Sequence, residues 1–269
     1  MPATSPAIFL FSGEGAHSAD PDLSVLKTSP AYTVIDDALK AQHGLAIDDL
    51  LSKHLGDHRA PFSPVVTTVM NILQADLWRM WGHEPAYALG HSVGEIAAAY
   101  VAGLIDVATA LRIAFENGVV AASLQGKMLH TTLPADQLSL LPNRELYLAA
   151  VNHDVPGTDE VSVTLCGVPD AVEAWLKSDE TSVELRPQHP WHHPAYLKTE
   201  SIKRWGTAGG DGAIDAFTQP ASSRCVFVSA TNAAVCRKVD KAHWAAWLSQ
   251  PVQFQAGLEV LAKAAAAQG

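Results

Sequence analysis

The sequence predicts an α/β protein, in which a core built on a parallel sheet is interrupted by a smaller α+β unit. Two short apolar runs, at 7–11 and 87–89, are each followed directly by a glycine-containing turn, which is typical of buried parallel strands. Long segments with helical spacing of apolar residues separate these runs. From about Gly126 the pattern changes to short strands and short helices. We therefore predict a large subdomain formed by 1–126 and 194–269, with a small subdomain inserted at 127–193.

The composition is that of a folded globular chain. Of its 269 residues, 48% are hydrophobic and 17% are charged, and the length suits one core with an insertion. The net charge of −10 argues against nucleic acid as a partner. No apolar run is long enough to span a membrane, and the run at 7–11 is too short for a secretory signal. The three cysteines lack metal-ligand spacing, so we expect a reduced, cytoplasmic protein.

Helical periodicity dominates the first part of the chain after the opening strand. The longest helix is predicted over 64–81, where Val65, Val69 and Ile72 recur on one face. Further helices are predicted over 30–42, 46–55, 96–103 and 107–125. Asp106 directly precedes the last of these and can cap its free N–H groups.

The inserted unit alternates strands and helices in the order β-α-β-β-α-β. Its strands are predicted over 128–133, 145–151, 161–165 and 182–186, and its helices over 134–141 and 169–177. This order is that of a ferredoxin-like unit. A buried strand at 225–229 and helices at 243–248 and 254–267 then return to the core, whereas 201–223 mixes a helical start with a glycine-rich loop.

The pentapeptide Gly90-His91-Ser92-Val93-Gly94 is the most informative feature of the chain. It lies between a predicted strand and a predicted helix, which is the context of a nucleophile elbow. The tight turn needs small residues at both ends and holds Ser92 out of both elements. The N–H groups at the start of the helix can stabilise a developing oxyanion. We therefore predict an α/β-hydrolase-like core with Ser92 as nucleophile, the alternative being an ordinary serine in a turn.

Segments spread along nearly the whole chain resemble the malonyl-CoA:acyl-carrier-protein transacylases and the acyltransferase domains of polyketide and fatty acid synthases. The run 90–95 resembles their Gly-His-Ser-x-Gly-Glu elbow, and 11–17 resembles their N-terminal Gly-Gln-Gly-x-Gln loop. Within the inserted subdomain, 150–152 resembles a segment that faces the active site. The run 191–194 is similar to their Phe-His-Ser/Thr-Pro segment, and 249–254 to their Asn-Pro-Val-x-Phe stretch.

The resemblance implies ping-pong acyl transfer through an acyl-serine intermediate. Ser92 would attack the thioester of an acyl-CoA with His192 as base, and the phosphopantetheine thiol of an acyl carrier protein would then take the acyl group. His193 stands where the family has Ser or Thr, so it is the alternative base. The family uses a Ser-His dyad whose histidine is oriented by a backbone carbonyl, here that of Gln250.

The same resemblance implies the partners of the chain. Acyl-CoA and an acyl carrier protein are expected, together with other synthase domains, and no permanently bound cofactor is needed. We expect the isolated domain to be a monomer that binds neither nucleic acid nor a membrane.

The resemblance also places an oxyanion hole at the backbone N–H groups of Val93 and Glu14. Glu14 departs from the glutamine of the family. Because backbone N–H groups stabilise the oxyanion, glutamate in place of glutamine need not abolish the oxyanion hole. A carboxylate beside a developing negative charge is nevertheless repulsive. We expect the Glu14 side chain to turn away or to take a proton.

The most useful departure lies in the helix after the elbow helix. Members that carry malonyl or methylmalonyl groups hold the free carboxylate with an arginine just before a glycine, and the corresponding residue here is Asn117. A buried charge left without its partner costs ~3–5 kcal/mol. The nearest cations in sequence, Arg112 and Lys127, lie too far along the chain. We expect an acyl group without a free carboxylate, although the apolar Val93 favours malonyl, and a misplaced alignment or an inactive copy is the alternative.

Three further residues are expected at the acyl site, namely His91, Trp191 and Asn152, with His91 also packing at the elbow. We expect no metal site. The histidine-rich segment 189–193 is interrupted by Pro190, and no Cys or carboxylate stands at ligand spacing.

Other functions stay open at the level of the sequence. A hydrolase of the same fold, which clears stalled acyl groups from carriers, would share Ser92 and His192 and differ in whether water or a thiol reaches the acyl-serine. A malonyl-specific transacylase would share them too. An α/β-hydrolase esterase usually needs an acidic residue between its serine and histidine. A non-catalytic docking module is disfavoured because both residues are present.

Overall fold

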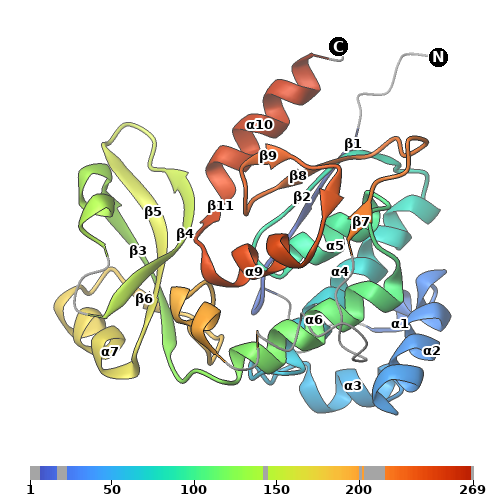
Figure 1. Cartoon of the computed structure of the whole chain (residues 1–269), viewed down its shortest axis with the longest axis horizontal. Helices are drawn as coiled ribbons and strands as arrows, with labels where there is room; N and C mark the ends of the chain where they lie inside the picture. Colours follow the sequence, from blue (N-terminus) through green and yellow to red (C-terminus); the bar gives the residue numbers. More distant parts are fainter. Residues whose placement is uncertain (1–6, 17–22, 142–144, 200–201, 203–215, 268–269) are drawn as a thin grey trace.

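The molecule is built around two sheets, which Figure 1 shows side by side. The computed structural model describes residues 7–16, 23–141, 145–199, 202 and 216–267. The strands of the two sheets are β1 (Ala7–Phe11), β2 (Pro85–Gly90), β3 (Lys127–Pro134), β4 (Leu146–Asp154), β5 (Glu160–Gly167), β6 (Val183–Glu184), β8 (Val226–Ser229), β9 (Ala234–Val235) and β11 (Val252–Gln253). The core sheet has the order β1-β2-β8-β9, and the second sheet has the order β11-β4-β5-β3-β6. A short antiparallel pair joins β7 (Phe217–Thr218) to β10 (Lys238–Val239).

Three strands of the core sheet are parallel, as the sequence predicts. β2 pairs in parallel with both β1 and β8, whereas β9 pairs antiparallel with β8. The prediction of a parallel sheet is therefore wrong at this edge, because the short connection from Ser229 to Ala234 reverses the chain without a crossover helix. The register sets Phe11 opposite Gly90. The loops that follow β1 and β2 therefore begin at the same, carboxyl-terminal end of the sheet.

Helices surround the core sheet. They are α1 (Leu23–Leu26), α2 (Ala31–His43), α3 (Ile47–His54), α4 (Ser63–Met80), α5 (Gly94–Val101), α6 (Val107–Ala121), α9 (Lys241–Ser249) and α10 (Phe254–Ala266). The predicted helices are present with ends shifted by a few residues, and the one-turn α1 is an addition. Asp106 caps α6 as predicted, since its carboxylate accepts from the Thr109 N–H at 2.8 Å. α4 packs against both α5 and α6.

The inserted unit forms an antiparallel sheet with α7 (Pro169–Ser178) packed against it. β5 pairs with β3 and β4, and β3 also pairs with β6. The predicted helix over 134–141 is a 3₁₀ helix (Ala135–Leu140) with no buried residue, so no apolar face stabilises an α-helix there. The strand predicted over 182–186 is only the two-residue β6.

A strand from the C-terminal segment extends this second sheet. β11 pairs in parallel with β4, with Val252 opposite Ala150. The predicted division at 194 therefore does not describe β11, which belongs to the sheet of the inserted unit. α10 follows directly and contacts both β2 and β4, and Figure 1 shows it between the two sheets. The segment from β11 to α10 therefore contacts both sheets.

No helix among the described residues is long and apolar enough to cross a membrane. The helical start that the sequence predicts at Ser201, and most of the loop after it, lie outside the described residues.

Candidate active site

Ser92 lies in a sharp turn between β2 and α5. Its φ of 52° is in the left-handed region that residues with side chains rarely adopt. A Cβ at Gly90 would lie 2.1 Å from the Gly94 carbonyl carbon, and one at Gly94 would lie 2.5 Å from the Phe11 carbonyl oxygen. Only glycine fits at these two positions. The local structure is therefore the elbow that the pentapeptide predicts.

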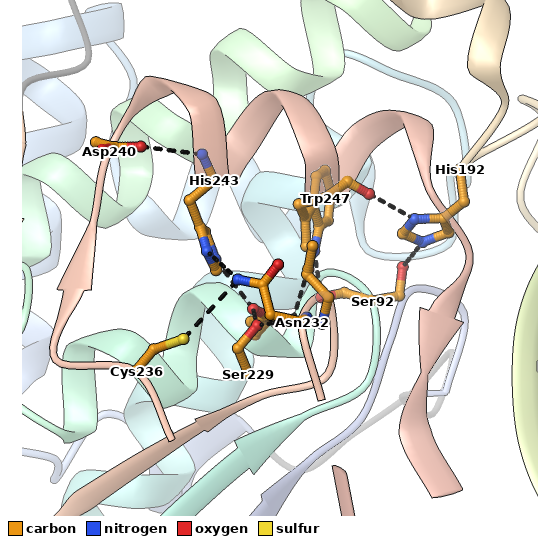
Figure 2. Close-up of polar contacts among 10 residues, drawn as sticks. Ser92, His192, Ser229, Asn232, Cys236, Asp240, His243 and Trp247 are labelled. Carbon is orange, nitrogen blue, oxygen red and sulfur yellow. Dashed lines mark hydrogen bonds and ion pairs between the residues drawn. The ribbon is translucent and has the colours of Figure 1, made fainter. Parts of the chain in front are cut away.

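Ser92 and His192 form a buried hydrogen-bonded pair. Ser92 Oγ lies 2.7 Å from His192 Nε2, and the two residues are 9% and 2% exposed. His192 also has a left-handed backbone, with a φ of 64°, and Figure 2 shows its ring directed toward the serine. Two strained residues that meet at one hydrogen bond are typical of a functional site.

A backbone carbonyl of α9 holds the second ring nitrogen of His192. His192 Nδ1 lies 2.7 Å from the Trp247 carbonyl oxygen, so Nδ1 carries the proton and Nε2 can accept one from Ser92. The prediction of Gln250 as the orienting carbonyl is corrected here, because Gln250 makes only a smaller contribution to the pKa of His192. In a continuous helix the Trp247 carbonyl would accept from the N–H of residue 251, but Pro251 has none.

Trp247 is the functional residue that the sequence analysis missed. Besides its carbonyl contact, its indole Nε1 donates to the Ser92 carbonyl oxygen at 2.9 Å. Pro251, four residues later, is a local signal that could have revealed the free carbonyl. The indole contact depends on long-range packing and has no such signal. Trp247 therefore touches both members of the pair.

His192 is uncharged near neutral pH. Burial lowers the pKa of His192 to about 4, and the Trp247 carbonyl offsets part of this effect, while His91 nearby lowers the pKa further. The neutral imidazole is the form that can take a proton from a hydroxyl. At pH 7 the ring is therefore in the form that can accept a proton from the Ser92 hydroxyl.

His193 points to different partners. Its Nδ1 accepts from the Ala195 N–H at 3.1 Å, and its ring lies against Tyr147 with ring centroids 4.1 Å apart. His189 Nδ1 contacts the Leu124 carbonyl oxygen at 3.2 Å. The three histidines of this segment thus contact different groups. Within the described part of the chain, no group of three or more His, Cys, Asp or Glu residues could hold a metal ion.

Glu14 follows β1 in a loop that packs against the elbow, where a Cβ at Gly13 would lie 3.3 Å from Ser92 Cβ. Burial raises the pKa of the Glu14 carboxyl to about 8, although the Ser63 hydroxyl and the Trp191 indole N–H offset part of this effect. Neither contact has the geometry of a hydrogen bond, and both carboxyl oxygens are buried without a partner among the described residues. Glu14 is therefore protonated at pH 7, one of the two expected outcomes.

A cavity of about 60 Å³ opens at Ser92. Its lining includes Ser92, His192, Glu14, His91 and Trp191. Asn152 does not line it, but its Oδ1 accepts from His91 Nε2 at 2.9 Å. Among the described residues, no Lys or Arg lines this cavity.

Asn117 lies fully buried in α6 and is not among the residues that line this cavity. Neither atom of its amide has a hydrogen-bond partner within the described residues. Lys127, one of the two cations near it in sequence, forms ion pairs with Glu173 at 3.1 Å and Glu184 at 3.3 Å. Lys127 is therefore paired with acidic side chains of the inserted unit.

The family model of the acyl transferase domain matches residues 8–268. The chain belongs to the acyl transferase domain family. The resemblance stated from the sequence is thereby confirmed.

Curated relatives of this acyl transferase domain include polyketide synthases. The domain is 27% identical over 272 residues to the "Reducing polyketide synthase DEP5" of Fusarium langsethiae, a match that covers 93% of this chain and 11% of the synthase. It is 30% identical over 288 residues to the "Highly reducing polyketide synthase fogA" of Aspergillus ruber, covering 96% of this chain and 12% of the synthase. The chain thus spans only about a tenth of the length of these relatives.

Solved structures share the α/β fold of this acyl transferase domain. A loading acyltransferase from the avermectin modular polyketide synthase superposes with a TM-score of 0.73 at 25% identity, covering 96% of this chain and 83% of that one. The structure described as MCAT from Streptococcus pneumoniae gives a TM-score of 0.71 at 20% identity, with 96% and 85% covered.

Proposed function

We propose that this domain moves an acyl group from an acyl-CoA thioester, through an ester on Ser92, to the phosphopantetheine thiol of an acyl carrier protein in polyketide or fatty acid biosynthesis. The observation that carries the proposal is the buried 2.7 Å hydrogen bond between Ser92 Oγ and His192 Nε2. A serine bonded to a neutral histidine, which is itself oriented by a further contact, is the arrangement of an activated nucleophile.

In the first half-reaction, His192 Nε2 takes the proton of Ser92 as Oγ attacks the thioester carbonyl. The imidazolium formed keeps its Nδ1–H on the Trp247 carbonyl. The tetrahedral intermediate collapses, the carbon–sulfur bond breaks, and coenzyme A leaves with the proton from His192. In the second half-reaction, the carrier thiol gives its proton to His192 and attacks the ester, and Ser92 recovers a proton as it leaves.

The oxyanion of each intermediate is assigned to the backbone N–H groups of Val93 and Glu14. Val93 is the N-terminal cap of α5, where the helix presents the positive end of its dipole. The Glu14 loop packs against the elbow through Gly13. A protonated Glu14 adds no negative charge beside the oxyanion, so its side chain is compatible with this role.

The proposed acyl group is short and has no free carboxylate. The cavity at Ser92 is small, at about 60 Å³. Its lining contains no Lys or Arg among the described residues, and Asn117 is neutral. A carboxylate there would be desolvated without a partner. Coenzyme A and the phosphopantetheine arm enter as substrates, so the mechanism needs no resident cofactor.

Intact-protein mass spectrometry tests the proposal directly. The domain is incubated with acetyl-, malonyl-, methylmalonyl- and medium-chain acyl-CoA, with Ser92→Ala as the control. We expect an acetyl adduct on the wild type and none on the variant. A malonyl adduct would keep the enzyme class and overturn the proposed acyl group. Release of free acid without an adduct would favour an editing hydrolase, and no reaction with any thioester would overturn the proposed function.

A further inference from the structure

One residue of α9 contacts both members of the catalytic pair. The Trp247 carbonyl accepts from His192 Nδ1 at 2.7 Å, and its indole donates to the Ser92 carbonyl oxygen at 2.9 Å. Because both contacts come from the same residue, the position and rotation of α9 set how closely His192 approaches Ser92. A displacement of about 1 Å at a reacting group can cost ~100-fold in rate.

A second contact joins α9 to the nucleophile helix one turn before Trp247. His243 Nε2 lies 3.0 Å from Glu95 Oε1, and the two side chains are 5% and 1% exposed. Glu95 is in the first turn of α5 and follows the catalytic serine by three positions. Residues four apart lie on one face of a helix, so His243 and Trp247 present the same face of α9 to the elbow.

The core sheet fixes Glu95 from its other side. The Glu95 carboxylate accepts from Ser229 Oγ at 2.6 Å and from both the backbone N–H and the Oγ1 of Thr231 at 3.1 Å. Ser229 ends β8, which pairs directly with the strand before the elbow. These donors leave the carboxylate one orientation, with Oε1 toward His243.

The second nitrogen of the His243 ring defines its tautomer. The Asn232 amide nitrogen lies 3.3 Å from His243 Nδ1 and can only donate, so Nδ1 accepts and the proton sits on Nε2. Nε2 lies 3.0 Å from Glu95 Oε1, a close polar contact that does not have the geometry of a hydrogen bond. Asp240 caps α9 by accepting from the His243 backbone N–H at 3.1 Å. Figure 2 shows His243 between Asp240 and Asn232, on the same helix as Trp247.

We propose that Glu95 and His243 form a positioning pair, which holds α9 against the elbow so that Trp247 keeps His192 within hydrogen-bond distance of Ser92. Buried polar pairs of this kind contribute little net stability, because desolvation offsets their attraction. Geometric control of the neighbouring dyad is the function that their placement fits. The proposal goes beyond the proposed function and rests only on Ser92 as the nucleophile, whatever acyl group it carries.

The test compares His243→Phe with His243→Gln in reaction with a fluorophosphonate probe. The probe reports the reactivity of Ser92 without coenzyme A or a carrier protein. Phe fills the space of the ring but has no donor for Glu95, and we expect the second-order rate constant of Ser92 labelling to fall by ~10- to 100-fold. Gln offers an amide N–H in place of Nε2–H, and we expect it to retain most of the rate.

The pH dependence of labelling separates positioning from packing. In the wild type, the acid limb reflects His192, whose pKa lies at about 4 and is raised by the Trp247 carbonyl against the effect of burial. If α9 shifts in His243→Phe and the Nδ1 contact lengthens, that support is lost and the limb moves to lower pH. A variant that only loosens the core would leave the limb in place.

His43→Phe is the matched control. His43 is a partly buried histidine of α2 whose ring packs against Phe62 and Phe115, and we expect unchanged labelling. If His243→Phe does not fold by circular dichroism, Ser229→Ala, which removes one donor to Glu95, should give a smaller loss in the same direction. Wild-type rates and an unmoved acid limb in a folded variant would overturn the positioning role. Normal labelling of a wild type that transfers no acyl group would count against the proposed function alone.

Discussion

The two sides of Ser92 are built differently. On the His192 side the polar atoms are paired, with Nε2 at Ser92 and Nδ1 at the Trp247 carbonyl, each at 2.7 Å. On the Glu14 side, both carboxyl oxygens, Ser63 Oγ and Trp191 Nε1 are buried without partners among the described residues. Burial acts on both sides but in opposite directions, because it lowers the pKa of His192 to about 4 and raises that of Glu14 to about 8. Both groups are therefore neutral at pH 7.

This contrast separates proton transfer from acyl recognition. The histidine side is fully organised before any substrate binds, which is what a general base needs. Each unpaired buried polar group on the other side costs ~1–3 kcal/mol, and such costs are expected mainly at functional sites. We therefore expect the histidine side to determine the reaction type and the Glu14 side to contact the acyl group.

The largest expected effect comes from removing the base. His192→Ala should lower the rate of Ser92 acylation by ~10²–10⁴-fold, because serine then attacks without a proton acceptor. Acylation by the preferred acyl-CoA is followed by time-resolved mass spectrometry. His193→Ala is the matched control, since His193 accepts from the Ala195 N–H, and it should acylate at nearly the wild-type rate. The opposite ranking of the two variants would transfer the role of base to His193.

A second prediction addresses Asn117, which is buried in α6 outside the lining of the cavity. Asn117→Arg should raise the malonyl adduct relative to the acetyl adduct by ~10²-fold, because pairing a buried carboxylate is worth ~3–5 kcal/mol. Arginine is several bonds longer than asparagine and carries a fork of donors that fits a carboxylate. Competition between the two thioesters, read by mass spectrometry, gives the ratio. Asn117→Gln, which adds length without charge, should leave it unchanged, and an unchanged ratio in the arginine variant would show that position 117 does not contact the acyl group.

The predictable part of the site is the part encoded locally. Gly90 and Gly94 fix the elbow because no side chain fits at either position, so a short motif is sufficient to place Ser92. His192 could be found because the segment around it resembles a family motif. The longer core helices were predicted from periodicity, whereas β9 and β11 were not, because two residues show no periodicity and β11 also pairs with a strand far away in sequence.

The contacts that orient the dyad depend on tertiary packing. The Trp247 carbonyl is free because of Pro251, but its approach to His192 requires α9 to lie beside the elbow. The contact between Glu95 and His243 joins residues far apart in sequence at 3.0 Å. Neither pair has a spacing rule, so the sequence suggested the carbonyl of Gln250, whereas the carbonyl of Trp247 lies 2.7 Å from His192 Nδ1.

The smallest predicted effect concerns Glu14 and its proton. Above about pH 8 the Glu14 carboxyl ionises beside the developing oxyanion, so wild-type acylation should decline several-fold there, in addition to any general change at high pH. Glu14→Gln has no charge to acquire, and its rate should stay level over the same range. Rates measured from near pH 6 to near pH 9.5 on both proteins give the comparison.

Protein stability provides an independent measure of the same proton. The unfolded chain releases the Glu14 proton near 4.5, whereas the folded state keeps it until about pH 8. The folded state therefore binds more protons within this window, and the contribution of Glu14 to the free energy of unfolding falls as pH rises through it. The melting temperature of Glu14→Gln should exceed that of the wild type by more near pH 9 than near pH 5. A constant difference in melting temperature would mean that the Glu14 carboxyl is ionised throughout this range. Glu14 would then not be neutral at pH 7.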